Sequence, residues 1–174
     1  MTPVLILPGI GGSGPLHWQS RWQELHRDYR RVEVPDWNRP ERGTWVAALA
    51  AAVDAAASAP VIVAHSLGCL AVAHWAAGGG RARAALLVAA ADPDGPSFPE
   101  VARSFAPVSL VPLGFPSRIV ASRNDPFGSF DFAQRCAAAW GSALTDLGAA
   151  GHVNADSGLG DWPAGQRLLA GLLG

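Results

Sequence analysis

The sequence contains no lysine: arginine accounts for all 13 of its basic residues. Without lysine, the protein cannot form a Schiff base with a carbonyl substrate, use a serine–lysine pair or hold a nucleotide with a P-loop lysine. Basic and acidic residues nearly balance, and the formal net charge is −1. We therefore expect no nucleic-acid partner, because surfaces that bind nucleic acids are strongly basic.

Cysteine is also scarce, with Cys69 and Cys136 the only two in the chain. Two cysteines are too few for a disulfide framework or a cysteine-rich metal site, and free cysteine is usually a small buried residue. The sequence shows no metal or cofactor motif, so we expect neither. It has no long apolar run and no basic segment before its first apolar run. We therefore expect a cytoplasmic protein that does not insert into membranes.

The 174 residues, 49% of them hydrophobic, fit one domain spanning 1–174. Short apolar runs alternate with helical patterns along the chain. The runs predict strands at 4–7, 31–34, 61–64, 85–90, 118–121 and 143–147. Helical spacing of apolar residues marks 45–53 (with Thr44 as N-cap), 70–77, 132–140 and 168–173. The alternation predicts an α/β protein with a six-stranded, mostly parallel sheet and helices on both faces.

One segment, 92–116, interrupts this alternation. It holds six of the 14 prolines together with several large apolar residues, among them Phe98, Phe105 and Phe115. Long irregular insertions are usually functional or disordered, and this one is too apolar for disorder. We predict an ordered, lid-like cover with a short helix near 100–105.

The segment 60–69 carries the strongest signal for chemistry. A β-branched run leads directly to Ser66, and a helical pattern follows at once. This strand–turn–helix context is typical of the nucleophile elbow of α/β-hydrolases, in which the positions two before and two after the serine must be small. Ala64 and Gly68 meet that requirement, although Ala64 replaces the usual glycine. The alternative is that Ser66 merely caps a helix.

A serine nucleophile needs a base, and the chain has five histidines. His65 adjoins Ser66 and would point away from it, whereas His26 and His74 lie in helical patterns. His152 follows the last predicted strand in a glycine-containing loop, which is where a mobile base belongs. We therefore predict that His152 is the base.

The acid that orients the histidine should lie between the other two, in the order serine, aspartate, histidine. Asp125 follows the strand 118–121 in a turn fixed by Pro126, and it is our first choice. Asp92 also follows a strand and stays open as the alternative. Asp131 and Asp156 rank lower.

The loop 8–15 follows the first predicted strand and contains four glycines, which allow a ligand to approach the backbone closely. We expect the N–H of Ile10, or failing that of Gly11, to form an oxyanion hole with the N–H of Leu67. The loop lacks the glycine spacing of a dinucleotide site and the lysine of a P-loop.

Taken together, these motifs resemble the small α/β-hydrolases of the YdeN-like family, which includes retinoblastoma-binding protein nine. The resemblance rests on Leu7–Gly9, His17–Trp18 with Trp22, Val34–Trp37, Ala64–Gly68, Ser122–Phe127, Gly151–Asn154, Ser157–Gly158 and Asp161–Pro163. It implies a compact hydrolase without a large cap domain, with Ser66, Asp125 and His152 at the triad positions. The L-x-C-x-E motif linked to retinoblastoma binding is incomplete here, because Ala71 stands where glutamate is required. We expect no such partner.

These observations predict a serine hydrolase that cleaves small-molecule carboxylic esters with small to medium acyl groups. We expect substrate contacts from Gly11, His17, Trp37, His65 and Phe127. A thioesterase or amidase would use the same residues, and a catalytically silent binding protein of the same fold is the alternative from another class.

Overall fold

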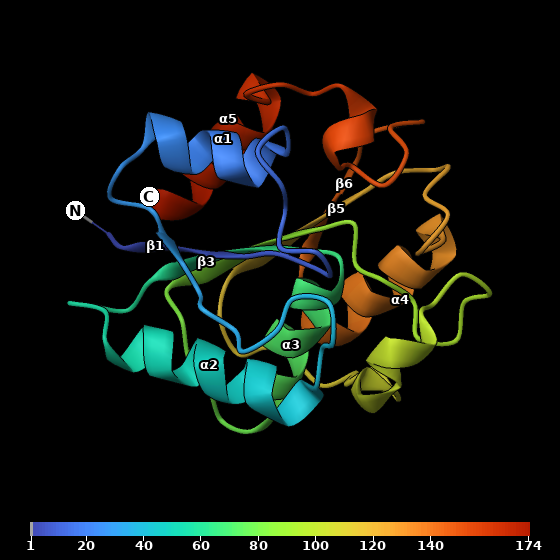
Figure 1. Ribbon diagram of the computed structural model, residues 1–174, viewed down its shortest axis with the longest axis horizontal. Helices are drawn as coiled ribbons and strands as arrows, with labels where there is room; N and C mark the ends of the chain where they lie inside the picture. The colour runs from blue at the N-terminus through green and yellow to red at the C-terminus, as the bar shows by residue number, and fades with distance from the viewer. Residues whose placement is uncertain (1) are drawn as a thin grey trace.

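The computed structural model describes residues 2–174 and contains one six-stranded sheet between two layers of helices (Figure 1). The strand order is β2-β1-β3-β4-β5-β6, and every neighbouring pair is parallel. The strands are β1 (Val4–Leu7), β2 (Arg30–Arg31), β3 (Val61–His65), β4 (Ala84–Val88), β5 (Ser117–Ala121) and β6 (Ala143–Asp146). The prediction of a six-stranded α/β fold without a large cap domain is confirmed. The sheet is parallel throughout.

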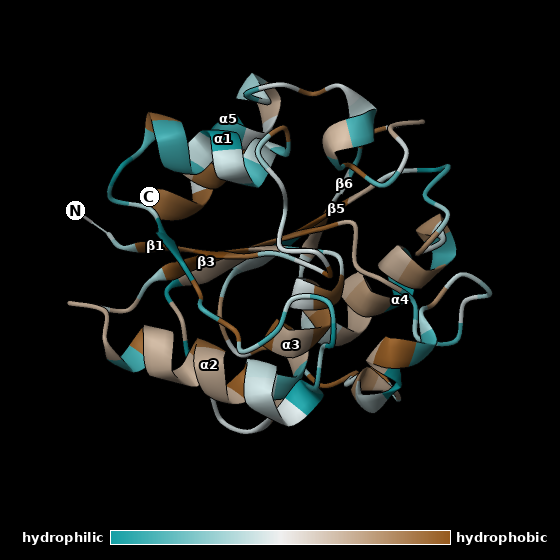
Figure 2. Cartoon of the chain, viewed as in Figure 1, coloured by the Kyte–Doolittle hydropathy of each residue, from teal (hydrophilic) through white to brown (hydrophobic). Residues whose placement is uncertain are grey.

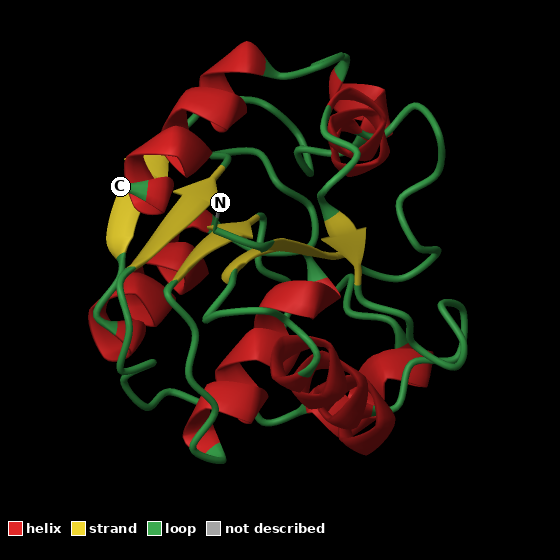
Figure 3. Ribbon diagram, turned by 90° about the vertical axis from the view of Figure 1, so that its left-hand side faces the viewer, coloured by secondary structure: helices red, strands yellow, loops and turns green. Residues whose placement is uncertain are grey.

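The helices are divided between the two faces of this sheet. Figure 1 shows α1 and α5 on one side and α2, α3 and α4 on the other, and Figure 3 shows helices on both sides of the sheet. The helices are α1 (Trp18–Leu25), α2 (Arg42–Asp54), α3 (Leu67–Ala77), α4 (Phe130–Trp140) and α5 (Pro163–Leu173). Two short 3₁₀ helices, η1 (Glu100–Phe105) and η2 (Ala155–Ser157), lie in connecting segments. Among residues 2–174, no helix is long and apolar enough to cross a membrane.

The strands supply side chains to both faces, so the sheet separates two hydrophobic cores. Leu5, Ile62 and Leu87 pack with α2, α3 and α4, whereas Ile6, Val63 and Leu86 pack with α1 and α5. Because successive side chains in a strand point to opposite faces, central strands covered on both sides read as continuous apolar runs. Figure 2 shows hydrophobic residues concentrated along β1 and β3.

Several predicted boundaries differ from the structure, and α1 was not among the predicted helices. Of the predicted strand 31–34, only Arg31 belongs to β2, and the Val32 N–H donates to the Ile6 carbonyl at 2.9 Å. Val34 is buried in the core without pairing. Helix α2 begins earlier than the Thr44 cap predicts. Its N-cap is Glu41, whose carboxylate accepts the Thr44 N–H at 2.8 Å.

The segment 92–116 is ordered, and η1 occupies the position predicted for its short helix. Its apolar residues, however, mostly fill the core rather than cover the sheet edge. Phe105 and Leu113 are fully buried in the core formed with α2, α3 and α4. The His74 ring hydrogen-bonds the Phe105 carbonyl at 2.9 Å, and this contact anchors the segment to α3.

Candidate active site

Ser66 lies in the sharp turn between β3 and α3. Its backbone has φ 53° and ψ −119°, a conformation that a residue with a Cβ rarely adopts. The turn needs glycine two residues later, because a Cβ at Gly68 would lie 2.6 Å from the Leu7 carbonyl oxygen and 2.8 Å from that of Pro8. The backbone strain and the close approach of β1 both fit a nucleophile elbow.

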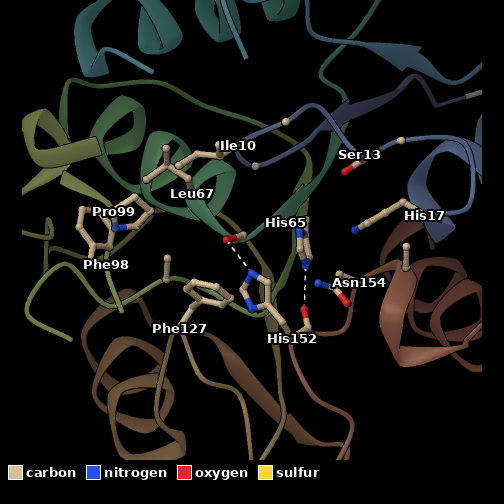
Figure 4. A pocket seen from close by; sticks show the side chains of 16 residues that line it. Ile10, Ser13, His17, His65, Leu67, Phe98, Pro99, Phe127, His152 and Asn154 are labelled. Carbon is tan, nitrogen blue, oxygen red and sulfur yellow. Dashed lines mark hydrogen bonds between the residues drawn. The ribbon is translucent and has the colours of Figure 1, made fainter. Parts of the chain in front are cut away.

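The side chains of Ser66, His152 and Asp125 form a continuous hydrogen-bonded series. Figure 4 shows the part of this series that starts at His152 Nε2 as a dashed line. His152 Nε2 lies 2.9 Å from Ser66 Oγ, and Nδ1 lies 2.8 and 3.0 Å from the two carboxylate oxygens of Asp125. Because a carboxylate only accepts, Nδ1 carries the proton and Nε2 accepts from the serine hydroxyl. The Asp125 side chain is 3% exposed, so water does not compete for this bond.

The alternative acids lie elsewhere. Asp92 uses its carboxylate to accept the backbone N–H of Asp94 at 3.0 Å, and it has no contact with His152. Asp131 lies in the first turn of α4, and Asp156 is exposed in η2. Of the four aspartates considered, Asp125 is the one within hydrogen-bond distance of His152.

Two backbone N–H groups beside Ser66 are free to receive a ligand oxygen. Those of Ile10 and Leu67 donate no hydrogen bond within the described part of the chain. Gly11, the second choice for this role, is excluded because its N–H donates to the Trp37 carbonyl at 3.0 Å. Leu67 follows Ser66 directly and begins α3, so its N–H also lies at the positive end of a helix dipole.

These groups line one pocket with a volume of about 480 Å³. Gly11, His17, His65 and Phe127 belong to its wall, as the sequence predicts. The prediction that Trp37 contacts the substrate is wrong, because Trp37 does not line the pocket. It lies behind the glycine loop, and its ring packs so closely against Gly12 that a Cβ on Gly12 would be 2.9 Å from it. The sequence does not indicate which side of a glycine loop faces a ligand.

Sequence reasoning missed further residues of this wall, among them Ser13, Phe98, Pro99 and Asn154. Phe98 and Pro99 come from the segment 92–116. The prediction of a lid-like cover concerned the whole segment and did not assign either residue to the pocket. Asn154 was recognisable as part of the loop that follows His152, but its side chain gave no separate signal.

Both histidines that accompany His152 in the pocket are held in the neutral form. Burial lowers the pKa of His65 well below its ordinary value, and the nearby His17 and His152 rings add to the effect. Burial lowers the pKa of His17 to about 4, with smaller contributions from His152 and Arg31. His17 Nδ1 caps α1 by accepting the Gln19 N–H at 3.1 Å, so Nε2 carries the proton.

The fold is that of the α/β-hydrolases, and serine hydrolases of this fold use a serine, an aspartate and a histidine in this chain order and geometry. The sequence matches the family model described as serine hydrolase over residues 4–171. The chain belongs to this family, and within it to the YdeN-like hydrolases.

Solved structures agree with this assignment. A protein described as a YdeN-like hydrolase from Pectobacterium atrosepticum is 32% identical, with a TM-score of 0.89 over 99% of this chain and 90% of that one. The ydeN gene product of Bacillus subtilis is 21% identical, with a TM-score of 0.82 over 99% of each chain. A thermophilic esterase from Thermogutta terrifontis shares the fold, at 15% identity and a TM-score of 0.69 over 99% of this chain and 90% of that one. A comparison with curated proteins gave no match.

Proposed function

We propose that the protein hydrolyses small-molecule carboxylic esters through an acyl-enzyme on Ser66. The observation that carries this proposal is the hydrogen-bonded series from Ser66 through His152 to Asp125, with spacings of 2.9 and 2.8 Å. A serine hydroxyl is a weak nucleophile until a neighbouring base takes its proton, and this series supplies the base and the group that orients it.

In the first half of the reaction, Ser66 Oγ attacks the ester carbonyl carbon while His152 Nε2 takes the hydroxyl proton. The carbonyl oxygen becomes negative and is bound by the N–H groups of Ile10 and Leu67. Donors of this kind are typically worth about 3–4 kcal/mol each in the transition state. The tetrahedral intermediate then expels the alcohol, which receives the proton from His152, and the acyl group stays on Ser66.

In the second half, a water molecule attacks the acyl-enzyme after giving a proton to His152. The intermediate breaks its bond to Ser66 Oγ, the proton returns to serine, and a carboxylic acid is released. Asp125 accepts from His152 Nδ1–H throughout and stabilises the imidazolium that forms in each half. No cofactor takes part in this scheme.

The acyl group is expected to bind against Phe98, Pro99 and Phe127, the apolar part of the pocket wall. A pocket of about 480 Å³ in all favours small to medium acyl chains. Thioesters and amides would react through the same groups. Esters are our first choice among these three substrate classes.

A fluorophosphonate probe and a chain-length series of p-nitrophenyl esters test this proposal. We expect the wild-type protein to be labelled and to hydrolyse the shorter esters, whereas Ser66→Ala should do neither. Absence of labelling of the wild type, or equal labelling of Ser66→Ala, would overturn the proposed hydrolase reaction on Ser66. A flat chain-length profile would contradict the assignment of the acyl pocket and leave the triad intact.

A further inference from the structure

The pocket has two chemically different ends, with Ser66 between them (Figure 4). Phe98, Pro99 and Phe127 lie on one side of the Ser66–His152 hydrogen bond. Ser13, His17 and Asn154 lie on the other, beyond the His65 ring. The proposed acyl pocket uses only the first of these ends. The second, called here the polar end, has no role in the scheme above.

His17 contributes an unsatisfied donor to the polar end. The residue is 4% exposed, and its Nε2 is buried without a hydrogen-bond partner among the described residues. Figure 4 shows a nitrogen of this ring directed into the pocket. A buried donor without an acceptor destabilises the folded protein, so such groups are rare outside sites where a ligand completes the bond.

Asn154 contributes a second donor. Its side-chain oxygen is already used, because it accepts the Asp156 N–H at 3.1 Å and caps η2. The amide nitrogen donates to no acceptor within residues 2–174, and Figure 4 shows it directed toward the His65 ring. The hydrogen bond of the oxygen fixes which end of the amide faces the pocket.

The surroundings offer these donors no internal acceptor. Among the described residues that line the pocket there is no aspartate or glutamate. The Ser13 hydroxyl gives its proton to Gln19 Oε1 at 2.7 Å, so its hydrogen is not available to a ligand. The N–H groups of His17 and Asn154 therefore set the preference of the polar end, which is for an oxygen that accepts hydrogen bonds.

We propose that the polar end binds a carbonyl or carboxylate oxygen in the leaving group of the substrate, held by Asn154 Nδ2–H and His17 Nε2–H. This inference rests on the proposed ester hydrolysis. The leaving group is assigned to this end for two reasons. The acyl group occupies the apolar end, and Asn154 lies two residues beyond His152, the group that must protonate the leaving alcohol.

Four butyrate esters with matched leaving groups test the proposal. The alcohols are phenol, 3-methylphenol, 3-hydroxybenzamide and 3-hydroxybenzoate, and each rate is divided by the rate of hydroxide-catalysed hydrolysis to remove differences in leaving-group acidity. We expect kcat/KM for the carboxamide or carboxylate ester to exceed that of the methyl ester by about fivefold to tenfold, the worth of one good hydrogen bond. A preference for the carboxamide alone would identify a neutral carbonyl, and a preference for the carboxylate an anion.

The variant Asn154→Asp removes the donor and keeps the oxygen that caps η2. We expect it to abolish the preference over the methyl ester, most strongly for the carboxylate because of charge repulsion. Asn38→Asp makes the same change on an exposed loop residue outside the pocket and should keep the wild-type preference. Equal normalised rates for all four esters, or an unchanged preference in Asn154→Asp, would overturn the proposal.

Binding without turnover separates this inference from the proposed function. In Ser66→Ala protein, 3-hydroxybenzamide should shift the NMR signals of the Asn154 side-chain amide and the His17 ring N–H, whereas 3-methylphenol should not. Such shifts without ester hydrolysis by the wild type would defeat the proposed reaction and keep the binding site. Ester hydrolysis without such shifts would defeat the binding site and keep the reaction.

Discussion

His65 Nε2–H donates to the carbonyl oxygen of His152 at 2.9 Å, so the residue before the nucleophile holds the backbone of the base. Trp18 Nε1–H donates to the next carbonyl, that of Val153, at 2.7 Å. Val153 has φ 49°, a left-handed conformation that a β-branched residue adopts at a cost. The two donors therefore hold a strained loop in the position that aligns His152 with Ser66.

The variant His65→Phe keeps a ring in this space and loses the donor. We expect kcat to fall about tenfold with a smaller change in KM, because a base displaced by a fraction of an ångström transfers protons poorly. The midpoint of the kcat/KM pH profile should also move. His74→Phe is the matched control, since it removes a similar 2.9 Å bond to a carbonyl, that of Phe105, outside the pocket. Equal activity of the two variants would contradict this positioning role.

Asparagine at position 125 should disable the orienting acid while keeping its shape. We expect Asp125→Asn to lower kcat by about 10⁴-fold, the loss seen when a triad histidine is held in the wrong tautomer. Asp92→Asn should retain near wild-type kcat, because an amide oxygen still accepts the Asp94 N–H that Asp92 holds at 3.0 Å. Measured kcat values that reverse this order would make Asp92 the triad acid.

Alanine at position 68 should destabilise the fold through a clash between backbone segments. The added Cβ would lie 2.6 Å from the Leu7 carbonyl oxygen, which the sheet prevents from moving. We expect a loss of about 1–3 kcal/mol in unfolding free energy, measured by urea denaturation. A Cβ at Gly171, an exposed position of α5, meets nothing within 4 Å, so Gly171→Ala should instead gain about 0.5–1 kcal/mol. An unchanged unfolding free energy in Gly68→Ala would show that β1 can move to accommodate the added Cβ.

Stability should fall as the pH drops from 7.5 to 5. The pKa of His17 is lowered from 6.5 to about 4 by burial, so in this range the unfolded chain binds a proton that the folded protein does not. For this residue the loss is about 2 kcal/mol, and His65 adds to it with the same sign. Urea unfolding at both pH values measures the slope. His17→Asn keeps an acceptor for the α1 cap and should reduce the slope, whereas an unchanged slope would exclude His17 as its source.

Shortening Phe98 should change which acyl group fits. Phe98 lines the apolar end of the pocket and is 7% exposed, so Phe98→Ala would enlarge that end. We expect the optimum of the p-nitrophenyl ester series to move to longer chains, with a stability loss of about 3–5 kcal/mol. Val101→Ala changes an exposed residue of the same segment and should keep the wild-type optimum. An unchanged optimum in Phe98→Ala would place the acyl group elsewhere.

The sequence predicted the fold well where burial and hydrogen bonding agree. The central strands β3, β4 and β5 are apolar on both faces, so their runs lie within one or two residues of the observed bounds. The prediction failed at 31–34, where Val34 is buried without pairing. Hydrophobic pattern reports burial, and it cannot separate a strand from an extended segment packed beside the sheet.

The candidate site, like the fold, was predicted only in part. Ser66, Asp125 and His152 occur along the chain in the predicted order. Each comes after a strand, and the end of an apolar run in the sequence marks where that strand ends. Whether Trp37 and Asn154 line the pocket depends on how their loops pack in three dimensions. The local sequence pattern does not contain this information. The sequence therefore indicated the three side chains that the structure brings within hydrogen-bond distance of one another, and it missed much of the pocket wall around them.

The segment 92–116 leaves the sheet after β4, the strand that lies between the one leading to Ser66 and the one leading to Asp125. It contributes Phe98 and Pro99 to the pocket but no group that reacts, and its Phe105 and Leu113 fasten it to the core. A new substrate range could therefore be introduced by exchanging residues near position 98, with the anchoring residues and the triad left unchanged. In this chain, the residues proposed to select the substrate can therefore change in evolution while those proposed to react stay the same.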